Sequence, residues 1–215
     1  MNCAVTAGPT YEPLDDVRRL TNFSTGQLGT ELANFLVARG HQVTLLISVQ
    51  ATHRGERRAQ RVEVFTTTDS LREKLQAMTA GKVNAVFHAA AVSDFRFGRI
   101  QLQPPHGKLK DIKSKKIPTN AGTLLVELVP TRKIIADLRA WFPAAKLAGW
   151  KFEAEGGRVD AIRAAEQQLA QCLTDACVAN GPAYGEGFGL ITRRGHVHLA
   201  DPPKLFDALE KWMQI

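Results

Sequence analysis

The chain has 215 residues, of which 44% are hydrophobic and 23% charged, proportions that exclude disordered, collagen-like and coiled-coil proteins. This length predicts one domain, covering residues 1–215, with a core large enough to need no disulfides. Lys and Arg number 28 against 21 Asp and Glu, and the resulting net charge of +7 favours anionic partners such as nucleic acid, acidic membranes or phosphorylated small molecules.

Short apolar runs alternate with amphipathic helical stretches along most of the chain. The expected strands are Cys3–Thr6, Gln42–Ile47, Val62–Phe65, Val83–His88, Leu124–Leu128, Lys146–Phe152 and Ala176–Ala179. The expected helices have apolar faces at Leu28, Leu32, Phe35 and Leu36, at Ile134, Ile135 and Leu138, and at Ile162, Ala165, Leu169 and Cys172, and another runs from an N-cap at Asp69 to about Met78. This alternation predicts an α/β fold, a Rossmann-like doubly wound and mostly parallel sheet.

Two segments interrupt the alternation. Arg96–Gly122 contains five lysines and Pro104-Pro105 but no sustained apolar period, so we expect a long basic flap there. The tail, about residues 188–215, is expected to form a hairpin with turn residues Arg193-Arg194-Gly195, followed by a helix that opens at Pro202-Pro203.

The three cysteines, Cys3, Cys172 and Cys177, lie within predicted strands and helices and have no C-x-x-C spacing. This usage is typical of a reduced intracellular protein, and no metal site is predicted. We see neither a signal-peptide pattern at the N-terminus nor an apolar run of the ~20 residues that a membrane span needs. The expected location is cytoplasmic.

Two segments rich in Gly, Ser and Thr are expected to meet at the end of the first strand. Gly8-Pro9-Thr10 follows this strand directly, and Ser24-Thr25-Gly26 precedes the first helix. Because ligands of open α/β sheets bind at the carboxyl ends of strands, these segments favour a phosphate site. The alternative is structural: Gly8 makes a turn and Ser24 caps the helix. The spacing differs from G-x-G-x-x-G, so the dinucleotide fingerprint is absent.

A run of small residues, Ala89-Ala90-Ala91, follows the expected strand that ends at His88. These residues would let a base or ribose approach the backbone, although core packing explains the alanines equally well. Asp94 follows and is costly to bury without a partner; it is able to accept from a base amino group or to help hold Mg²⁺. The lysine-rich flap is either a solvated loop or a nucleic-acid contact, and the lack of interleaved aromatic residues argues against nucleic acid. A second basic cluster, Arg54, Arg57, Arg58 and Arg61, is interpreted as surface.

Residues 6–26, TAGPTYEPLDDVRRLTNFSTG, resemble the opening of phosphopantothenoylcysteine synthetases, T-A-G-G-T-x-E-P-[IL]-D-x-V-R-x-[IL]-[ST]-N-x-S-S-G. The resemblance spans about residues 3–180, because four later motifs also match: HAAAVSDF at residues 88–95, KSKK at 113–116, GWKFE at 149–153 and VAN at 178–180.

The resemblance implies a ligase that joins 4′-phosphopantothenate to cysteine in coenzyme A biosynthesis, using CTP or ATP with Mg²⁺. It also implies a homodimer, without flavin. Lys113 would neutralise charge while the acyl nucleotidylate forms. Asn22 would orient the acyl carbonyl for attack by the cysteine amine. The residues expected to bind nucleotide or substrate are Gly8, Thr10, Ser24, Thr25, Gly26, His88, Ala89, Ala90, Asp94, Lys116, Arg132, Lys133, Trp150 and Asn180.

The chain departs from this family pattern where the triphosphate is expected. Glycine is replaced by Pro9, lysine or arginine by Gln27, two helical lysines by Gln168 and Cys172, a P-D pair by Arg132-Lys133, and phenylalanine by Trp150. We expect Arg132 and Lys133 to replace the missing cations.

Two alternatives to the ligase remain. The departures are compatible with a non-catalytic nucleotide-binding homologue. An NAD(P)-dependent reductase is a weaker alternative, since the Tyr-x-x-x-Lys pair it needs is absent: Tyr11 and Tyr184 are followed four residues on by Asp15 and Phe188.

Overall fold

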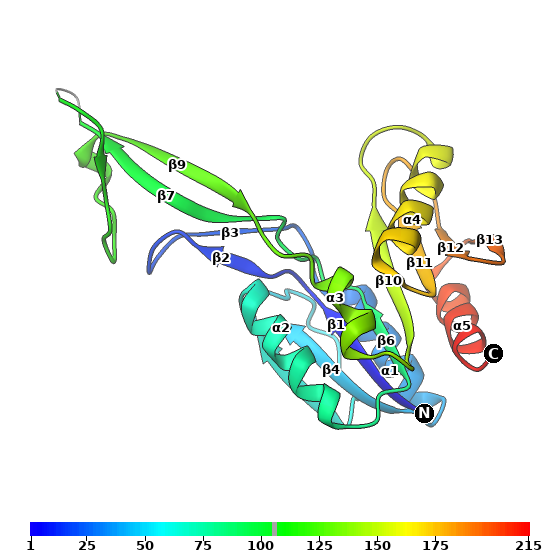
Figure 1. Cartoon of the computed structure of the whole chain (residues 1–215). Helices are drawn as coiled ribbons and strands as arrows, with labels where there is room; N and C mark the ends of the chain where they lie inside the picture. The colour runs from blue at the N-terminus through cyan, green and yellow to red at the C-terminus, as the bar shows by residue number, and fades with distance from the viewer. Residues whose placement is uncertain (105–106) are drawn as a thin grey trace.

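The computed structural model describes residues 1–104 and 107–215, and residues 105–106 of the expected flap lie outside the described residues. An eight-stranded sheet forms the centre of the molecule, in the order β13-β12-β11-β10-β6-β1-β4-β5 (Figure 1). Its strands are β1 (Asn2–Ala7), β4 (Gln42–Ser48), β5 (Arg61–Phe65), β6 (Ala85–His88), β10 (Lys146–Phe152), β11 (Ala176–Asn180), β12 (Phe188–Thr192) and β13 (Gly195–Leu199). All pairings are parallel except those of β12 and β13, which confirms the predicted doubly wound fold.

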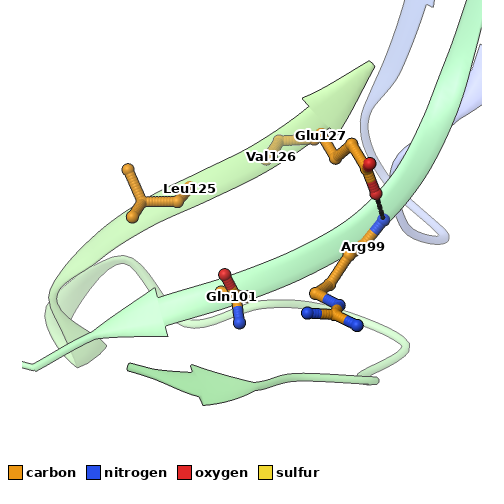
Figure 2. Close-up of a pocket in the computed structure, with 5 residues that line it drawn as sticks. All are labelled: Arg99, Gln101, Leu125, Val126 and Glu127. Carbon is orange, nitrogen blue, oxygen red and sulfur yellow. Dashed lines mark hydrogen bonds between the residues drawn. The ribbon is translucent and has the colours of Figure 1, made fainter. Parts of the chain in front are cut away.

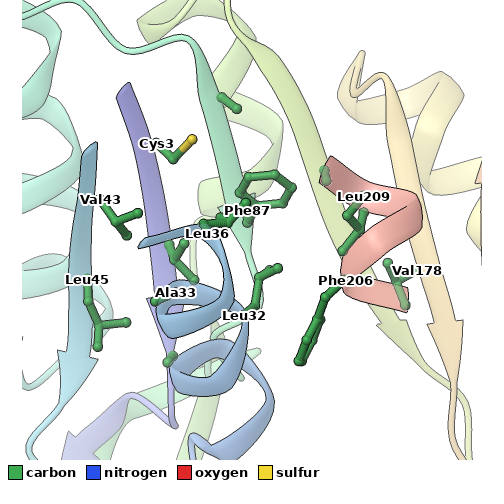
Figure 3. Packing of buried hydrophobic residues seen from close by; sticks show 14 of the residues in the cluster. Cys3, Leu32, Ala33, Leu36, Val43, Leu45, Phe87, Val178, Phe206 and Leu209 are labelled. Carbon is green, nitrogen blue, oxygen red and sulfur yellow. The ribbon is translucent and has the colours of Figure 1, made fainter. Parts of the chain in front are cut away.

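Helices cover both faces of this sheet because alternate strand residues supply two apolar surfaces. On one face lie α1 (Gln27–Ala38) and α5 (Pro202–Met213), and Figure 3 shows Leu32 and Leu36 of α1 with Phe206 of α5 over Phe87 and Val178. The opposite face is covered by α2 (Thr68–Ala77), α3 (Ile134–Trp141) and α4 (Arg158–Cys172). Two short 3₁₀ turns, Met78–Ala80 and Thr119–Ala121, complete the helical segments.

The expected flap differs most from its prediction. Strands β7 (Phe95–Gln103), β8 (Lys110–Asp111) and β9 (Thr123–Pro130) form a separate antiparallel sheet that projects from the domain, and we call residues 95–130 the arm (Figure 1). The strands of this segment were not predicted. The placement of Leu124–Leu128 in the central sheet was wrong, since β9 pairs with β7. Most arm side chains are exposed, so backbone hydrogen bonds define these strands and leave no clear apolar period.

A short hairpin was also missed. Strands β2 (Tyr11–Pro13) and β3 (Arg19–Thr21) pair antiparallel beneath the arm (Figure 1). The Arg19 guanidinium lies 5.0 Å from the centre of the Tyr11 ring. Three-residue strands are too short to show an alternating pattern. We refer to residues 11–21 as the hairpin.

Smaller differences concern element ends. The N-cap of α2 is Thr67, whose hydroxyl accepts from the Ser70 N–H; the predicted cap, Asp69, lies in the first turn. Strand β6 begins at Ala85, two residues later than expected. The tail forms the predicted hairpin and helix, with Asp201 as N-cap of α5 and Pro202 at its first position. No helix within the described ranges has both the length and the apolar character that crossing a bilayer requires.

Candidate functional site

Two glycines bring separate loops together at the carboxyl end of β1. Gly8 and Gly26 have positive φ angles of 83° and 76°, a region that glycine adopts without strain. A Cβ atom on Gly26 would lie 3.2 Å from the Gly8 nitrogen, and one on Gly8 would lie 2.8 Å from the Ser48 Cβ. The predicted convergence of the two segments is therefore present in the structure.

Helix α1 begins at this junction without a side-chain cap. Gly26 is its N-cap residue, so the alternative in which Ser24 caps the helix was wrong. The Thr25 hydroxyl accepts from the Gln27 N–H at 3.2 Å, and the Thr25 carbonyl accepts from the His53 N–H at 3.0 Å. Thr25 is exposed and Ser24 half-buried, so this helix start faces solvent with its positive dipole end.

The chain beyond β6 runs alongside the chain beyond β1. The Ala91 N–H donates to the Gly8 carbonyl and the Thr10 N–H donates to the Ala91 carbonyl, both at 3.1 Å. This place is the topological switch point, because β1 is followed by β4 on one side while β6 pairs on the other. Ala89, Ala90 and Ala91 are half-buried, whereas Asp94 is exposed at the start of the arm.

Thr6 links β1 to this region and was not predicted. Its hydroxyl accepts from the Ala90 N–H and contacts the His88 Nδ1, both at 3.0 Å. His88 is buried, and this burial lowers its pKa to about 4. The neutral His88 ring therefore fixes the Thr6 hydroxyl, which in turn accepts from the Ala90 N–H.

Thr10 lies in the interior and ties three segments together. Its hydroxyl accepts from the Ser93 N–H at 2.8 Å and lies 3.3 Å from the hydroxyl of Thr68. The buried Glu12 carboxylate accepts from the Thr68 N–H at 3.1 Å, at the start of α2. Thr10 thus joins the loops after β1 and β6 to α2, a role that the sequence pattern did not indicate.

Asn22 and the predicted flap lysines lie in different places. The Asn22 amide donates to the Val92 carbonyl at 3.1 Å, one residue beyond Ala91 and close to the glycine loops. Lys113 and Lys116 are exposed on the segment after β8, which contacts the tip of the hairpin away from the carboxyl end of β1 (Figure 1). Within one chain, the structure does not bring Lys113 to Asn22 or to Gly8.

Basic residues gather where α3, β10 and α4 meet. Burial raises the pKa of the Cys172 thiol, and the charges of Lys133 and Lys151 partly offset that rise. Arg132 pairs with Asp137 at 2.7 Å, and Lys151 pairs with Glu153 at 3.0 Å. Lys151 was missed, although its place at the carboxyl end of a predicted strand was a usable signal.

Two further expected residues lie near the ends of neighbouring strands. Trp150 and Asn180 lie near the carboxyl ends of β10 and β11. The Trp150 indole N–H is buried, and no described protein atom accepts from it. A buried donor without an acceptor is costly, so this N–H is suited to a ligand oxygen.

Other features lie outside this region. A hollow of about 500 Å³ on the arm is lined by Arg99, Gln101, Leu125, Val126 and Glu127 (Figure 2). The Glu127 carboxylate accepts from the Arg99 backbone N–H at 2.9 Å, where β7 and β9 shift register. Arg54, Arg57, Arg58 and Arg61 are all exposed, as predicted.

A doubly wound sheet with glycine loops and a helix start at its switch point defines the Rossmann-like class of α/β proteins, a class whose ligands bind at the carboxyl ends of the strands. The family model of the DNA/pantothenate metabolism flavoprotein C-terminal domain matches residues 1–211, and the chain belongs to this family. The family assignment made from the sequence motifs is thereby confirmed.

The bifunctional coenzyme A biosynthesis protein CoaBC of Thermococcus kodakarensis is 33% identical over 176 residues, which are 82% of this chain and 40% of the relative. The Bacillus subtilis CoaBC is 30% identical over 189 residues, 87% of this chain and 42% of the relative. The chain therefore spans less than half the length of these relatives.

Solved structures share the fold. The DNA/pantothenate metabolism flavoprotein of Streptococcus pneumoniae superposes with a TM-score of 0.85 at 23% identity, over 100% of this chain and 98% of that one. A Cab2 variant in complex with phosphopantothenate-cysteine superposes with a TM-score of 0.70 at 19% identity, over 99% of this chain and 87% of that one.

The buried state of His88 predicts a pH dependence of stability. With a folded pKa of about 4 against 6.5 in the unfolded chain, only the unfolded chain takes up a proton between these values. The contribution of neutral His88 to the free energy of unfolding is complete above pH 6.5 and is lost as the pH falls toward 4, by about 2–3 kcal/mol. The substitution His88→Asn should keep an acceptor for Thr6 and flatten this loss in urea unfolding at pH 4.5 and 7.

The exposed His196 provides the control, because His196→Asn should leave the pH dependence of unfolding unchanged. An equally steep loss of stability in the His88→Asn variant would show that His88 is charged in the folded protein.

Proposed function

We propose that this chain is a phosphopantothenate–cysteine ligase of coenzyme A biosynthesis, which uses CTP or ATP as the magnesium complex. The observation that carries the proposal is the meeting of Gly8, Gly26 and Ala91 at the switch point, beside an uncapped helix start. Backbone N–H groups and a positive helix end there suit a triphosphate. Family membership supports the same substrate class.

The reaction has two steps. A carboxylate oxygen of 4′-phosphopantothenate attacks the α-phosphate of the nucleotide, and pyrophosphate leaves. The cysteine amine then attacks the acyl carbon of the acyl nucleotidylate, loses a proton and displaces the nucleoside monophosphate. The first step converts an oxide into a good leaving group, so the protein supplies position and charge rather than a covalent group.

The roles divide between two places in the chain. Lys113 stabilises negative charge during nucleotidylate formation, and Lys116 adds positive charge beside it. Asn22, held by Val92 near the glycine loops, orients the acyl carbonyl for attack by the amine. Because Lys113 lies away from Asn22 in one chain, the arm must move or a second copy must complete the site (Figure 1).

Lys133 and Lys151 contact the triphosphate from α3 and β10, in place of the cations absent at Gln168 and Cys172. The charges of both lysines act on the Cys172 thiol, which supports this role. The Trp150 indole N–H donates to a ligand oxygen, and Asp94, exposed and close to Ala91, faces the base or the Mg²⁺ complex.

The first test separates the two steps. Asn22→Asp should still exchange pyrophosphate into nucleotide in the presence of phosphopantothenate but fail to form product with cysteine. Lys113→Gln should abolish exchange, because charge stabilisation of the first step is lost. Isotope exchange and product assays on both variants, with CTP and with ATP, measure this. Parallel loss of both activities in both variants would contradict the division of roles.

The second test concerns the triphosphate cations. A phosphate contact from an ionised donor is worth about 1.5–3 kcal/mol, so Lys133→Ala should weaken nucleotide binding tenfold or more. Arg132→Ala should cost less, because Asp137 competes for its guanidinium. The exposed Arg57 is the control, since Arg57→Ala should leave calorimetric affinity for CTP and ATP unchanged. Unchanged affinity in the Lys133 variant would favour a non-catalytic homologue.

The third test concerns assembly. The arm and hairpin expose several large apolar side chains, namely Val17, Phe95, Leu109, Leu125 and Leu128, and Phe23 is exposed just beyond the hairpin. Thin β-ribbons bury too little on their own to be very stable, so we expect a homodimer that covers this surface. Light scattering at micromolar concentration should give twice the chain mass. A single-chain mass would count against the dimer.

A further inference from the structure

The tip of the hairpin and the lysine segment of the arm are joined by a compact set of hydrogen bonds. The Ile117 N–H donates to Asp15 Oδ2 at 3.1 Å, and Arg18 Nη2 donates to the Ile117 carbonyl at 2.6 Å. The Asp16 N–H donates to the Lys115 carbonyl at 2.9 Å. We call these contacts of Asp15, Asp16 and Arg18 with Lys115 and Ile117 the clasp.

Asp15 is the centre of the clasp. Its second oxygen, Oδ1, accepts from the N–H groups of Val17 and Arg18 at 3.0 and 2.8 Å, which fixes the hairpin turn. Its Oδ2 also accepts from Arg18 Nη2 at 2.6 Å. Loss of hydration opposes ionisation of this carboxyl, but the hydrogen bonds from Ile117, Val17 and Arg18 prevail and lower its pKa to about 2. Asp15 is therefore ionised throughout the physiological range.

Burial of Ile117 anchors the same segment. Ile117 is 3% exposed, whereas Lys113, Ser114, Lys115, Lys116 and Pro118 around it are all exposed. One apolar side chain within a run of exposed polar residues fixes the backbone while leaving the lysine side chains accessible. The backbone of this segment is therefore anchored, while its lysine side chains are not buried.

We propose that Asp15 and Arg18 are positioning residues: through the clasp they hold the backbone of Lys113–Ile117 so that its lysines present their charge in one place. Charged groups stabilise a transition state best when they are ordered in advance, since ordering a flexible lysine segment during the reaction costs conformational entropy. The role of the positioned lysines rests on the proposed ligase function. The clasp itself does not depend on that function.

Trypsin cleavage tests the clasp without any assay of activity. In the Asp15→Asn variant, Oδ1 is able to keep the hairpin turn, while an NH₂ group replaces the oxygen that accepts from Ile117 and Arg18. The lysine segment should then open more often, and cleavage after Lys113, Lys115 and Lys116 should accelerate about tenfold or more. Cleavage at the Arg193-Arg194 turn, followed in the same digest by mass spectrometry, should keep its rate.

Asp16→Asn is the matched control, because Asp16 takes part in the clasp through its backbone N–H and its side chain is exposed. This variant should be cleaved at the wild-type rate. Arg18→Gln provides a second disruption, which removes the donor to the Ile117 carbonyl, and it should accelerate cleavage as well. Wild-type cleavage rates in both the Asp15 and the Arg18 variants would overturn the clasp.

Pyrophosphate exchange tests the positioning role. Asp15→Asn should lower kcat for exchange about tenfold while KM for the nucleotide changes less than twofold, because the lysines act on the transition state. Asp16→Asn should leave both unchanged. Faster cleavage with an unchanged kcat would overturn the positioning role. If the wild-type chain shows no exchange at all, the ligase proposal fails, and the digests still decide the clasp.

Discussion

Close backbone packing at the carboxyl end of β1 is the constraint on which the rest of the molecule depends. A Cβ atom on Gly29 would lie 2.7 Å from the Ala7 Cβ and 2.9 Å from the Thr6 carbonyl oxygen, so α1 lies directly on the strand. This approach brings Gly26 against Gly8 and places the start of α1 at the switch point. A larger residue at Gly29 or Gly26 would separate the helix from the strand end and open the site, and one at Gly8 would collide with Ser48.

The molecule divides into a packed scaffold and a polar extension. In the scaffold, apolar side chains on both faces of the central sheet fix each loop that reaches the site. The arm has little core of its own, and its position depends on backbone pairing and on the contacts that Asp15 and Arg18 make with Ile117. Hydrophobic burial therefore places the glycine loops at the switch point, whereas charged hydrogen bonds place the lysine segment.

The sequence predicted the scaffold because buried parallel strands and amphipathic helices leave strong periodic patterns, as at Gln42–Ile47 and Leu28–Leu36. It did not predict β7, whose exposed side chains need no pattern, nor the hairpin, whose strands are too short. The glycine loops were predictable from their place after β1, and Asn22 from a family motif. The buried network of Thr6, Thr10 and Glu12 was not predictable, because its partners Ser93, Thr68 and Ala90 are distant in sequence.

Only the structure shows which of the positive side chains are paired with carboxylates. Among the arginines of the second basic cluster, Arg58 pairs with Glu56 and Arg61 with Glu63, so part of the positive charge is compensated locally. By contrast, within the described residues no carboxylate lies in salt-bridge distance of Lys113, Lys115, Lys116 or Lys133. Arginine forms bidentate pairs well, while lysine is a mobile point charge that reorients toward an incoming phosphate. Arg18 thus holds two segments together, whereas in the described part of the chain the lysines of the arm and Lys133 keep their charge free of carboxylates and able to reorient.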